Sequence, residues 1–246
     1  MNYLQQLEQL NTIDDLRALP IEHILVIVAH PYDTELWCGG TVCRFTDAGK
    51  QVAYLLFNKA HKGVGNATRT PQEIAAMQEA EELAAARILG VESVTFLHWP
   101  DSEVEPGVAL RQELVLQIRH HRPDLIVTHD PEISYRPHPD HRALGSAALD
   151  AVFSSTHDPL SRAGQNQKES LPVQNLQEVW LFTIQSPNIW INIATTLERK
   201  IAARLAHTSQ HIDTEALKHY WHDRSVAIGK PAGLEVAEAF KQVDLR

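Results

Sequence analysis

Four short, mostly apolar segments constrain the fold of this chain more than any other feature. They are HILVIVAH at 23–30, VAYLLF at 52–57, SVTFLHW at 93–99 and DLIVTH at 124–129. Runs without polar alternation are typical of strands buried on both faces of a parallel sheet. Helical patterns fill the intervals, at about 39–49, at 71–89 and at 108–121. The alternation predicts an α/β fold: a doubly wound, mostly parallel sheet with helices on both faces.

The whole chain, residues 1–246, is predicted to form one domain, because its length fits a single large α/β unit. Apolar residues at helical spacing predict an N-terminal helix within 1–20, and a polar stretch predicts a long surface loop at 154–177. The remaining predicted elements are strands at 178–184 and 188–193, helices at about 195–208 and 213–228, and a short terminal helix at 234–241.

Composition excludes several classes of protein. The chain has 22 Lys and Arg against 31 Asp and Glu, a formal charge of −9, which argues against a general nucleic-acid binder. No apolar run reaches the roughly 18 residues of a membrane span, and the first twenty residues lack the pattern of a secretory signal. Two cysteines cannot build a disulfide framework. We therefore expect a cytoplasmic protein, and a homo-oligomer stays open.

The chain has 14 histidines, and several of them gather after two of the predicted strands. His30 and Asp33 follow the first strand, and His138 and His141 follow the fourth. Ligands of open α/β sheets bind beyond the carboxyl ends of the strands. Two imidazoles, one carboxylate and an open position make a catalytic zinc site. The same donors also suit Fe²⁺, so the metal stays open between the two.

Several segments, in this order along the chain, resemble those of one known family. They are AHPYDTELWCGGT at 29–41, AAARILGV at 84–91, FLHWPDSEV at 96–104, RPDLIVTH at 122–129, HPDHRALG at 138–145 and VWLF at 179–182. This series is similar to the motifs of the LmbE-like (PIG-L) N-acetylglucosaminyl deacetylases, over roughly residues 23–212. The resemblance implies a Rossmann-like fold.

The resemblance also implies a function and a set of site residues. It implies a zinc-dependent amidohydrolase that removes an N-acyl group from an amino sugar or a related small-molecule conjugate. By the same resemblance, His30, Asp33 and His141 hold the metal. His138 steadies the oxyanion or protonates the leaving amine, and Asp140 orients His138.

One departure from the family pattern affects the chemistry. Where the family has the first Asp of HPDD, its general base, this chain has Tyr32. A phenol with a pKa near 10 is protonated at pH 7, and losing a general base typically costs about 10²–10⁴ in rate. Three alternatives stay open. In the first, Glu35, Asp140 or the metal hydroxide alone takes the place of the base. In the second, Tyr32 donates a proton or a hydrogen bond to the substrate of a different reaction. In the third, the protein is a diverged homologue that binds a metal but has lost hydrolysis.

Two further departures concern the surroundings of the substrate. Gln78 stands where the family usually has a substrate-binding Arg, and Asn192 stands where it commonly has Asp. Tyr135, three residues before His138, and His61, after the second strand, are further candidates for substrate contact. We expect the polar loop at 154–177 to border the pocket.

Overall fold

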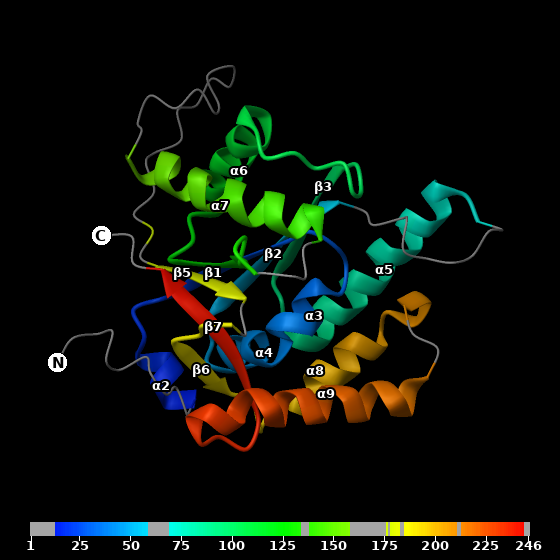
Figure 1. The fold of residues 1–246 in the computed structure, drawn as a ribbon, viewed down its shortest axis with the longest axis vertical. Helices are drawn as coiled ribbons and strands as arrows, with labels where there is room; N and C mark the ends of the chain where they lie inside the picture. Colours follow the sequence, from blue (N-terminus) through cyan, green and yellow to red (C-terminus); the bar gives the residue numbers. More distant parts are fainter. Residues whose placement is uncertain are drawn as a thin grey trace.

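The computed structural model describes residues 13–58, 69–133, 138–157, 176, 178–182, 185–210 and 213–243. Its centre is a seven-stranded sheet with the order β3-β2-β1-β4-β5-β7-β6 (Figure 1). The strands are β1 (His23–Val28), β2 (Gln51–Asn58), β3 (Ser93–Trp99), β4 (Leu125–His129), β5 (Glu178–Phe182), β6 (Ile189–Asn192) and β7 (Ala237–Val243). The first five pair in parallel, and β7 pairs antiparallel with both β5 and β6.

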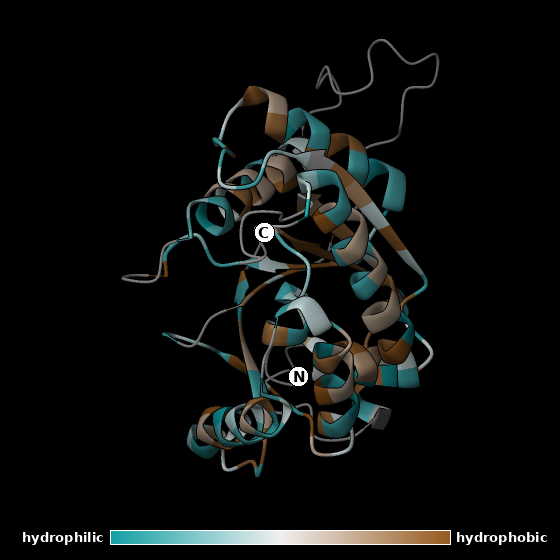
Figure 2. Ribbon diagram, turned by 90° about the vertical axis from the view of Figure 1, so that its right-hand side faces the viewer, coloured by the Kyte–Doolittle hydropathy of each residue, from teal (hydrophilic) through white to brown (hydrophobic). Residues whose placement is uncertain are grey.

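Helices cover both faces of this sheet. Alternate residues of β1 enter two separate hydrophobic cores: Ile24 and Val26 belong to one, Leu25 and Ile27 to the other. The first core contains residues of α2 (Ile13–Ala18), α4 (Gly39–Asp47), α5 (Pro71–Leu89), α8 (Leu197–Leu205) and α9 (Thr214–Gly229). The second contains residues of α6 (Val108–His121) and α7 (Pro139–His157). In Figure 2 the inner strands are brown and the helices mix brown with teal, as two-sided burial requires. The predicted fold class is confirmed.

Local signals explain where the elements begin and end. α5 starts at a capping box in which Thr70 and Glu73 satisfy each other's backbone N–H groups, with Pro71 as its first residue. It ends at Gly90, whose φ of 80° is the left-handed conformation that glycine adopts without strain. The predicted helices at 71–89 and 108–121 therefore coincide with α5 and α6.

Two predictions for the second half of the chain are wrong. The segment 234–241 is not a terminal helix, because Ala237–Val243 forms β7. Its sequence, AEAFKQV, favours a helix, but its position between β5 and β6 supplies hydrogen bonds on both edges and overrides that preference. The predicted loop at 154–177 starts too early, because α7 continues to His157. Residues 158–175 lie outside the described part.

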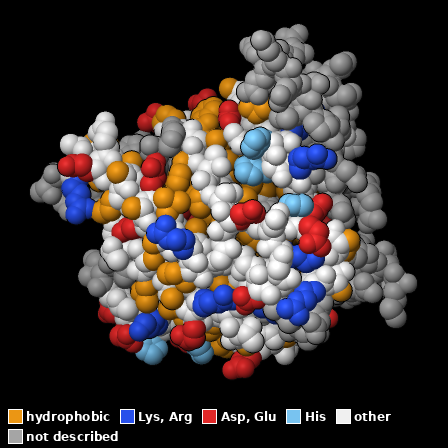
Figure 3. Space-filling view, turned by 180° about the vertical axis from the view of Figure 1, so that it is seen from behind, with side chains coloured by type: hydrophobic (Ala, Val, Ile, Leu, Met, Phe, Trp, Pro, Cys, Tyr) orange, Lys and Arg blue, Asp and Glu red, His pale blue; other side chains and the backbone are white. Residues whose placement is uncertain are grey.

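None of the described helices is both long and apolar enough to cross a bilayer. On the face shown in Figure 3, the described acidic and basic side chains are interspersed rather than gathered into a basic patch. Of the predicted N-terminal helix, the described part is α2, and residues 1–12 lie outside it.

Candidate metal centre

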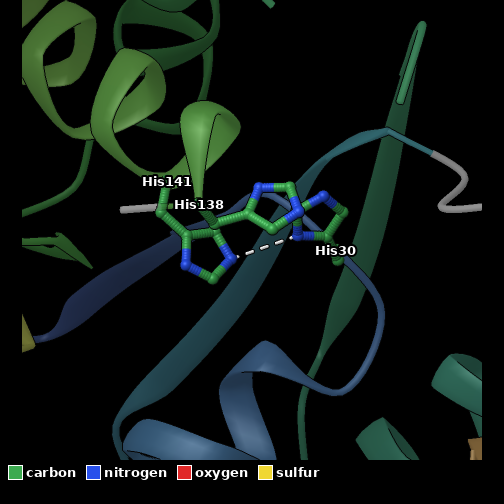
Figure 4. A group of neighbouring side chains, drawn as sticks. All are labelled: His30, His138 and His141. Atoms are coloured by element: carbon green, nitrogen blue, oxygen red, sulfur yellow. Dashed lines mark hydrogen bonds between the residues drawn. The ribbon is translucent and has the colours of Figure 1, made fainter. Parts of the chain in front are cut away.

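The strand order places the candidate site. The chain leaves β1 to one side of the sheet and β4 to the other, and ligands of open α/β sheets bind at the carboxyl ends of two such neighbouring strands. His30 follows β1, and Asp33 begins the short helix α3 (Asp33–Trp37). His138 and His141 lie at the start of α7, and Figure 4 shows their rings directed toward His30. Segments more than 100 residues apart in sequence therefore meet at one point.

The three predicted ligands converge with the geometry of a metal site. Nδ1 of His30 lies 3.1 Å from Nε2 of His141 (Figure 4), and that nitrogen lies 3.1 Å from Oδ2 of Asp33. The third side of the triangle, from His30 Nδ1 to Asp33 Oδ2, is 3.4 Å. Bonds of about 2.0–2.1 Å at tetrahedral angles put zinc ligands about 3.3 Å apart. The donor atoms fit a tetrahedral zinc ion with one position left open.

Two carboxylates lie near Nε2 of His30, the ring nitrogen that is not part of the ligand triangle. Nε2 lies 3.1 Å from Oδ2 of Asp140 and 3.5 Å from Oδ1 of Asp101. Burial lowers the pKa of His30, but its hydrogen bonds with Asp101, Asp140 and Asp33 outweigh burial and raise that pKa to about 12. A carboxylate on the outer nitrogen of a ligating histidine fixes the ring and increases its basicity. The arrangement favours a cation at Nδ1 of His30, the nitrogen near His141 and Asp33.

Asp33 supplies the negative charge of the ligand set. Its side chain is buried, and Oδ2 accepts a hydrogen bond of 2.9 Å from the backbone N–H of His30. Burial raises the pKa of Asp33, yet the charge of His141 and hydrogen bonds with His129, His141 and His30 lower it well below its usual value. Asp33 is therefore ionised throughout the physiological range.

His129, the last residue of β4, is a part of the site that the sequence reasoning did not select. Its buried ring stacks on that of His141, with centroids 4.0 Å apart. Nε2 accepts a hydrogen bond from the backbone N–H of Ala29 at 3.2 Å and lies 3.4 Å from Asp33. Burial, and then His141, lower the pKa of His129 to about 4, so the ring is neutral. The sequence signal that could have identified His129 is its place at the carboxyl end of an apolar predicted strand.

His138 lies beside two of the three predicted ligands, His30 and His141. It is exposed, and its ring centroid is 4.5 Å from that of His30. The backbone N–H of Asp140 donates to its Nδ1 at 3.3 Å, which leaves Nε2 as the protonated nitrogen of a neutral ring. Burial and the neighbouring histidines lower its pKa, which favours that neutral form. The Asp140 carboxylate contacts His30 and the Ser102 N–H, so orienting His138 stays a prediction for it.

Tyr32 has a strained backbone and a half-buried side chain. Its φ is 72°, in the left-handed region, and its N–H donates to Oε2 of Glu82 at 3.0 Å. The guanidinium carbon of Arg204 lies 5.1 Å from the ring centre, and the His207 ring meets its edge at 6.1 Å. Burial, and then the charge of Asp33, raise the pKa of Tyr32. The phenol stays protonated at neutral pH and cannot serve as a general base.

The other candidates lie around this centre or outside the described residues. Glu35 is two residues after Asp33, so it points to the opposite side of α3, where it lies 3.3 Å from Nε2 of His207. Gln78 is buried on α5, one turn before Glu82 and on the same helix face. Asn192 lies on the edge strand β6, where its Oδ1 accepts from the Ala194 N–H. His61 and Tyr135 lie outside the described residues.

Comparison with known proteins finds a matching family and similar relatives. The sequence profile of the family described as GlcNAc-PI de-N-acetylase (PIG-L) matches residues 25–152. Diacetylchitobiose deacetylase of Thermococcus kodakarensis is 30% identical over 91% of this chain and 84% of its own. A 1D-myo-inositol 2-acetamido-2-deoxy-alpha-D-glucopyranoside deacetylase of Mycobacterium sp. (strain KMS) is 25% identical over 77% of this chain and 74% of its own.

Two solved structures are similar to this chain. N,N′-diacetylchitobiose deacetylase from Pyrococcus horikoshii, complexed with its inhibitor MPG, superposes with a TM-score of 0.86 at 27% identity, over 92% of this chain and 85% of its own. GalB, the 4-carboxy-2-hydroxymuconate hydratase of Pseudomonas putida, shares the fold at 20% identity, with a TM-score of 0.74 over 92% of this chain and 97% of its own. The chain therefore belongs to the PIG-L (LmbE-like) family, which places it among the enzymes that hydrolyse amides.

Proposed function

We propose that this protein is a zinc-dependent amidohydrolase that removes an N-acyl group from an amino sugar or a related small-molecule conjugate. One observation carries the proposal: the donor atoms of His30, Asp33 and His141 form a triangle with sides of 3.1, 3.1 and 3.4 Å. Two similar proteins, which align with 91% and 77% of this chain, are deacetylases of N-acetylated sugars, and they support that substrate class. A cytoplasmic location stays a prediction.

His30, Asp33 and His141 would hold the metal, with zinc as the proposed ion and Fe²⁺ as the alternative that shares these donors. A divalent cation bound there supplies a Lewis acid for the acyl carbonyl and lowers the pKa of water. The Asp33 carboxylate would compensate part of the charge of this cation. The carboxylates of Asp101 and Asp140 hold the His30 ring in place.

In this reaction water adds to the acyl carbon, the carbon–nitrogen bond breaks, and the amine leaves with an added proton. His138 is suited to donate a hydrogen bond from Nε2 to the carbonyl oxygen as negative charge develops there, because its Nδ1 is held by the Asp140 N–H. Neither Tyr32, which is protonated, nor Glu35, which points away, is suited to take the proton of that water. We propose that a metal held by His30, Asp33 and His141 would supply the activation of that water, with Asp140, whose carboxylate contacts His30, as the alternative base.

The test starts from the protein purified without added metal. We expect about one equivalent of bound zinc, release of acetate from N,N′-diacetylchitobiose or another N-acetylglucosaminide, and loss of both with His141→Ala. His219→Ala serves as a control because His219 is an exposed histidine on α9. Protein that binds no divalent metal would overturn the proposal.

Tyr32 favours a second candidate function, in which the metal centre supports a reaction other than amide hydrolysis. A protonated phenol beside the ligands can donate a hydrogen bond or a proton to a substrate, but cannot accept one from water. Tyr32→Asp and Tyr32→Phe distinguish the two functions. If Tyr32→Asp raises acetate release, a carboxylate base is what the native site lacks. If wild-type protein releases no acetate and both variants abolish another measured activity, the second function holds.

A further inference from the structure

A second group of ionisable side chains lies behind the metal centre, and we call it the closed cluster. It consists of Glu35 on α3, Glu82 on α5 and His207 after α8, and all three side chains are fully buried. Nε2 of His207 lies 3.3 Å from Oε2 of Glu35 and 3.7 Å from Oε2 of Glu82. Figure 1 shows α3 beside α5 and α8, which bring these residues together.

The closed cluster is connected to the metal centre through the backbone of Tyr32. Oε2 of Glu82 accepts the Tyr32 N–H at 3.0 Å, across 50 positions of sequence. Tyr32 is the residue before α3, and its side chain makes no capping hydrogen bond to that helix. A left-handed residue other than glycine costs roughly 1–2 kcal/mol, so a contact must hold this turn. The Glu82 carboxyl supplies such a contact from another helix, in addition to the local hydrogen bonds between His30 and Asp33.

The turn at Tyr32 determines the direction of a metal ligand. Asp33 is the next residue, and its backbone N–H donates to the carbonyl oxygen of His30 at 3.2 Å. A change of φ at Tyr32 would therefore move Asp33 relative to His30, and with it one corner of the ligand triangle. Ligand positions must hold to about 0.5 Å for a site to function.

Other members of the surroundings reinforce the same turn. Glu35 anchors the first turn of α3 to His207, and the Arg204 guanidinium covers one face of the Tyr32 ring. Burial, and then the charge of Glu35, raise the pKa of Glu82 well above its ordinary value. A glutamine amide in this place keeps a carbonyl oxygen for the Tyr32 N–H.

We propose that Glu82 is a positioning residue of the metal centre, which fixes the left-handed turn at Tyr32 through its backbone N–H and so aims Asp33 at the ion. The proposal rests on the metal centre of the proposed function. It goes further by assigning a role in metal affinity to a residue that touches neither metal nor substrate.

Zinc affinity, measured by competition with a chelator, tests this role without any substrate. Glu82→Leu removes the acceptor, and we expect it to weaken zinc binding about 10–100-fold, as loss of a contact that supports a ligand typically does. Glu82→Gln keeps the acceptor and should bind zinc within about threefold of wild type. Glu81→Leu is the matched control, because Glu81 is the neighbouring buried acid and accepts from Thr208 and Ser209 instead.

Amide hydrogen exchange of metal-free protein tests the turn itself, so it separates this inference from the proposed function. We expect a protected Tyr32 amide in wild type and Glu82→Gln, and faster exchange in Glu82→Leu with Glu81→Leu unchanged. If Glu82→Leu does not fold, an unprotected Tyr32 amide in wild type overturns the inference. Unchanged zinc affinity in Glu82→Leu overturns it too. So do two zinc equivalents in wild type with one lost in Glu82→Gln, because the closed cluster would then be a cation site.

Discussion

Two buried groups of acids and histidines lie on opposite sides of α3, and they differ in access and in geometry. In the metal centre, three donor atoms lie 3.1–3.4 Å apart, and the His141 side chain, 23% exposed, reaches solvent. In the closed cluster the corresponding contacts are 3.3 and 3.7 Å, and each side chain is 0% exposed. Residue types are nearly the same in both. The two groups differ in solvent access, in the spacing of their donor atoms and in their further contacts. These differences distinguish a site that can hold an ion from a group that supports the fold.

Charge balance separates the two groups in the same way. Around His30 the carboxylates of Asp33, Asp101 and Asp140 leave negative charge that an ion can compensate. The closed cluster compensates its own charge, because the pKa of Glu82 is raised and the positive charge of Arg204 acts on Glu35. Burying an uncompensated charge is costly, so a group without solvent access has to be balanced internally.

Asp33→Asn should have the largest effect, because it removes the anionic ligand from the metal centre. We expect loss of bound zinc and a fall in kcat/KM of about 10³-fold, which corresponds to several kcal/mol of transition-state stabilisation. Metal analysis and acetate release measure the two effects. Retention of zinc and of activity within tenfold of wild type would remove Asp33 from the ligand set.

Lowering the pH should reduce the free energy of unfolding of the protein through His129, which belongs to the metal centre. Its pKa is about 4 in the folded protein, against about 6.5 when unfolded, so the unfolded state binds the extra proton as pH falls. Its contribution is complete above pH 6.5 and is lost progressively between pH 6.5 and about 4, to a total of about 3 kcal/mol. Urea unfolding of metal-free wild type and His129→Asn measures it. Parallel pH profiles of the two proteins would contradict it.

Glu35→Gln should have a smaller effect and a different kind of effect. It is the same carboxylate-to-amide change as Asp33→Asn, two positions away, but in the closed cluster. We expect a loss of about 2 kcal/mol in the free energy of unfolding, because Arg204 and His207 lose a buried anionic partner. Zinc affinity should stay within about threefold. A loss of zinc equal to that of Asp33→Asn would erase the distinction between the two groups.

The metal centre could be predicted from the sequence and the closed cluster could not. The strand order predicts that His30 and Asp33 meet one of the later histidines, and the family resemblance selects His141 among them. Glu82 contacts Tyr32 from the middle of a regular helix, where no local signal marks a buried acid. Its role depends on how α5 packs, which is tertiary information.

The same limit explains the fold-level errors. β1 to β4 are apolar enough to be recognised without knowledge of their neighbours. The segment Ala237–Val243 becomes a strand only because β5 and β6 offer it two edges. The place of His129 at the end of a strand was visible in the sequence, but its contacts with the His141 ring and the Ala29 N–H depend on how the site packs.

The smallest expected effect compares the strained turn at Tyr32 with a second one far from the site. Arg122 ends α6 with a φ of 50°, and its side chain is exposed. Arg122→Gly should stabilise the protein by about 0.5 kcal/mol, because glycine adopts this helix-ending conformation without strain but loses more entropy on folding. Zinc affinity and activity should not change. Tyr32→Gly keeps the backbone N–H that donates to Glu82 and adopts the same conformation without strain, so zinc affinity should stay within about threefold of wild type there too. If Tyr32→Gly weakens zinc binding instead, the Tyr32 side chain, and not the turn that Glu82 holds, supports the metal centre.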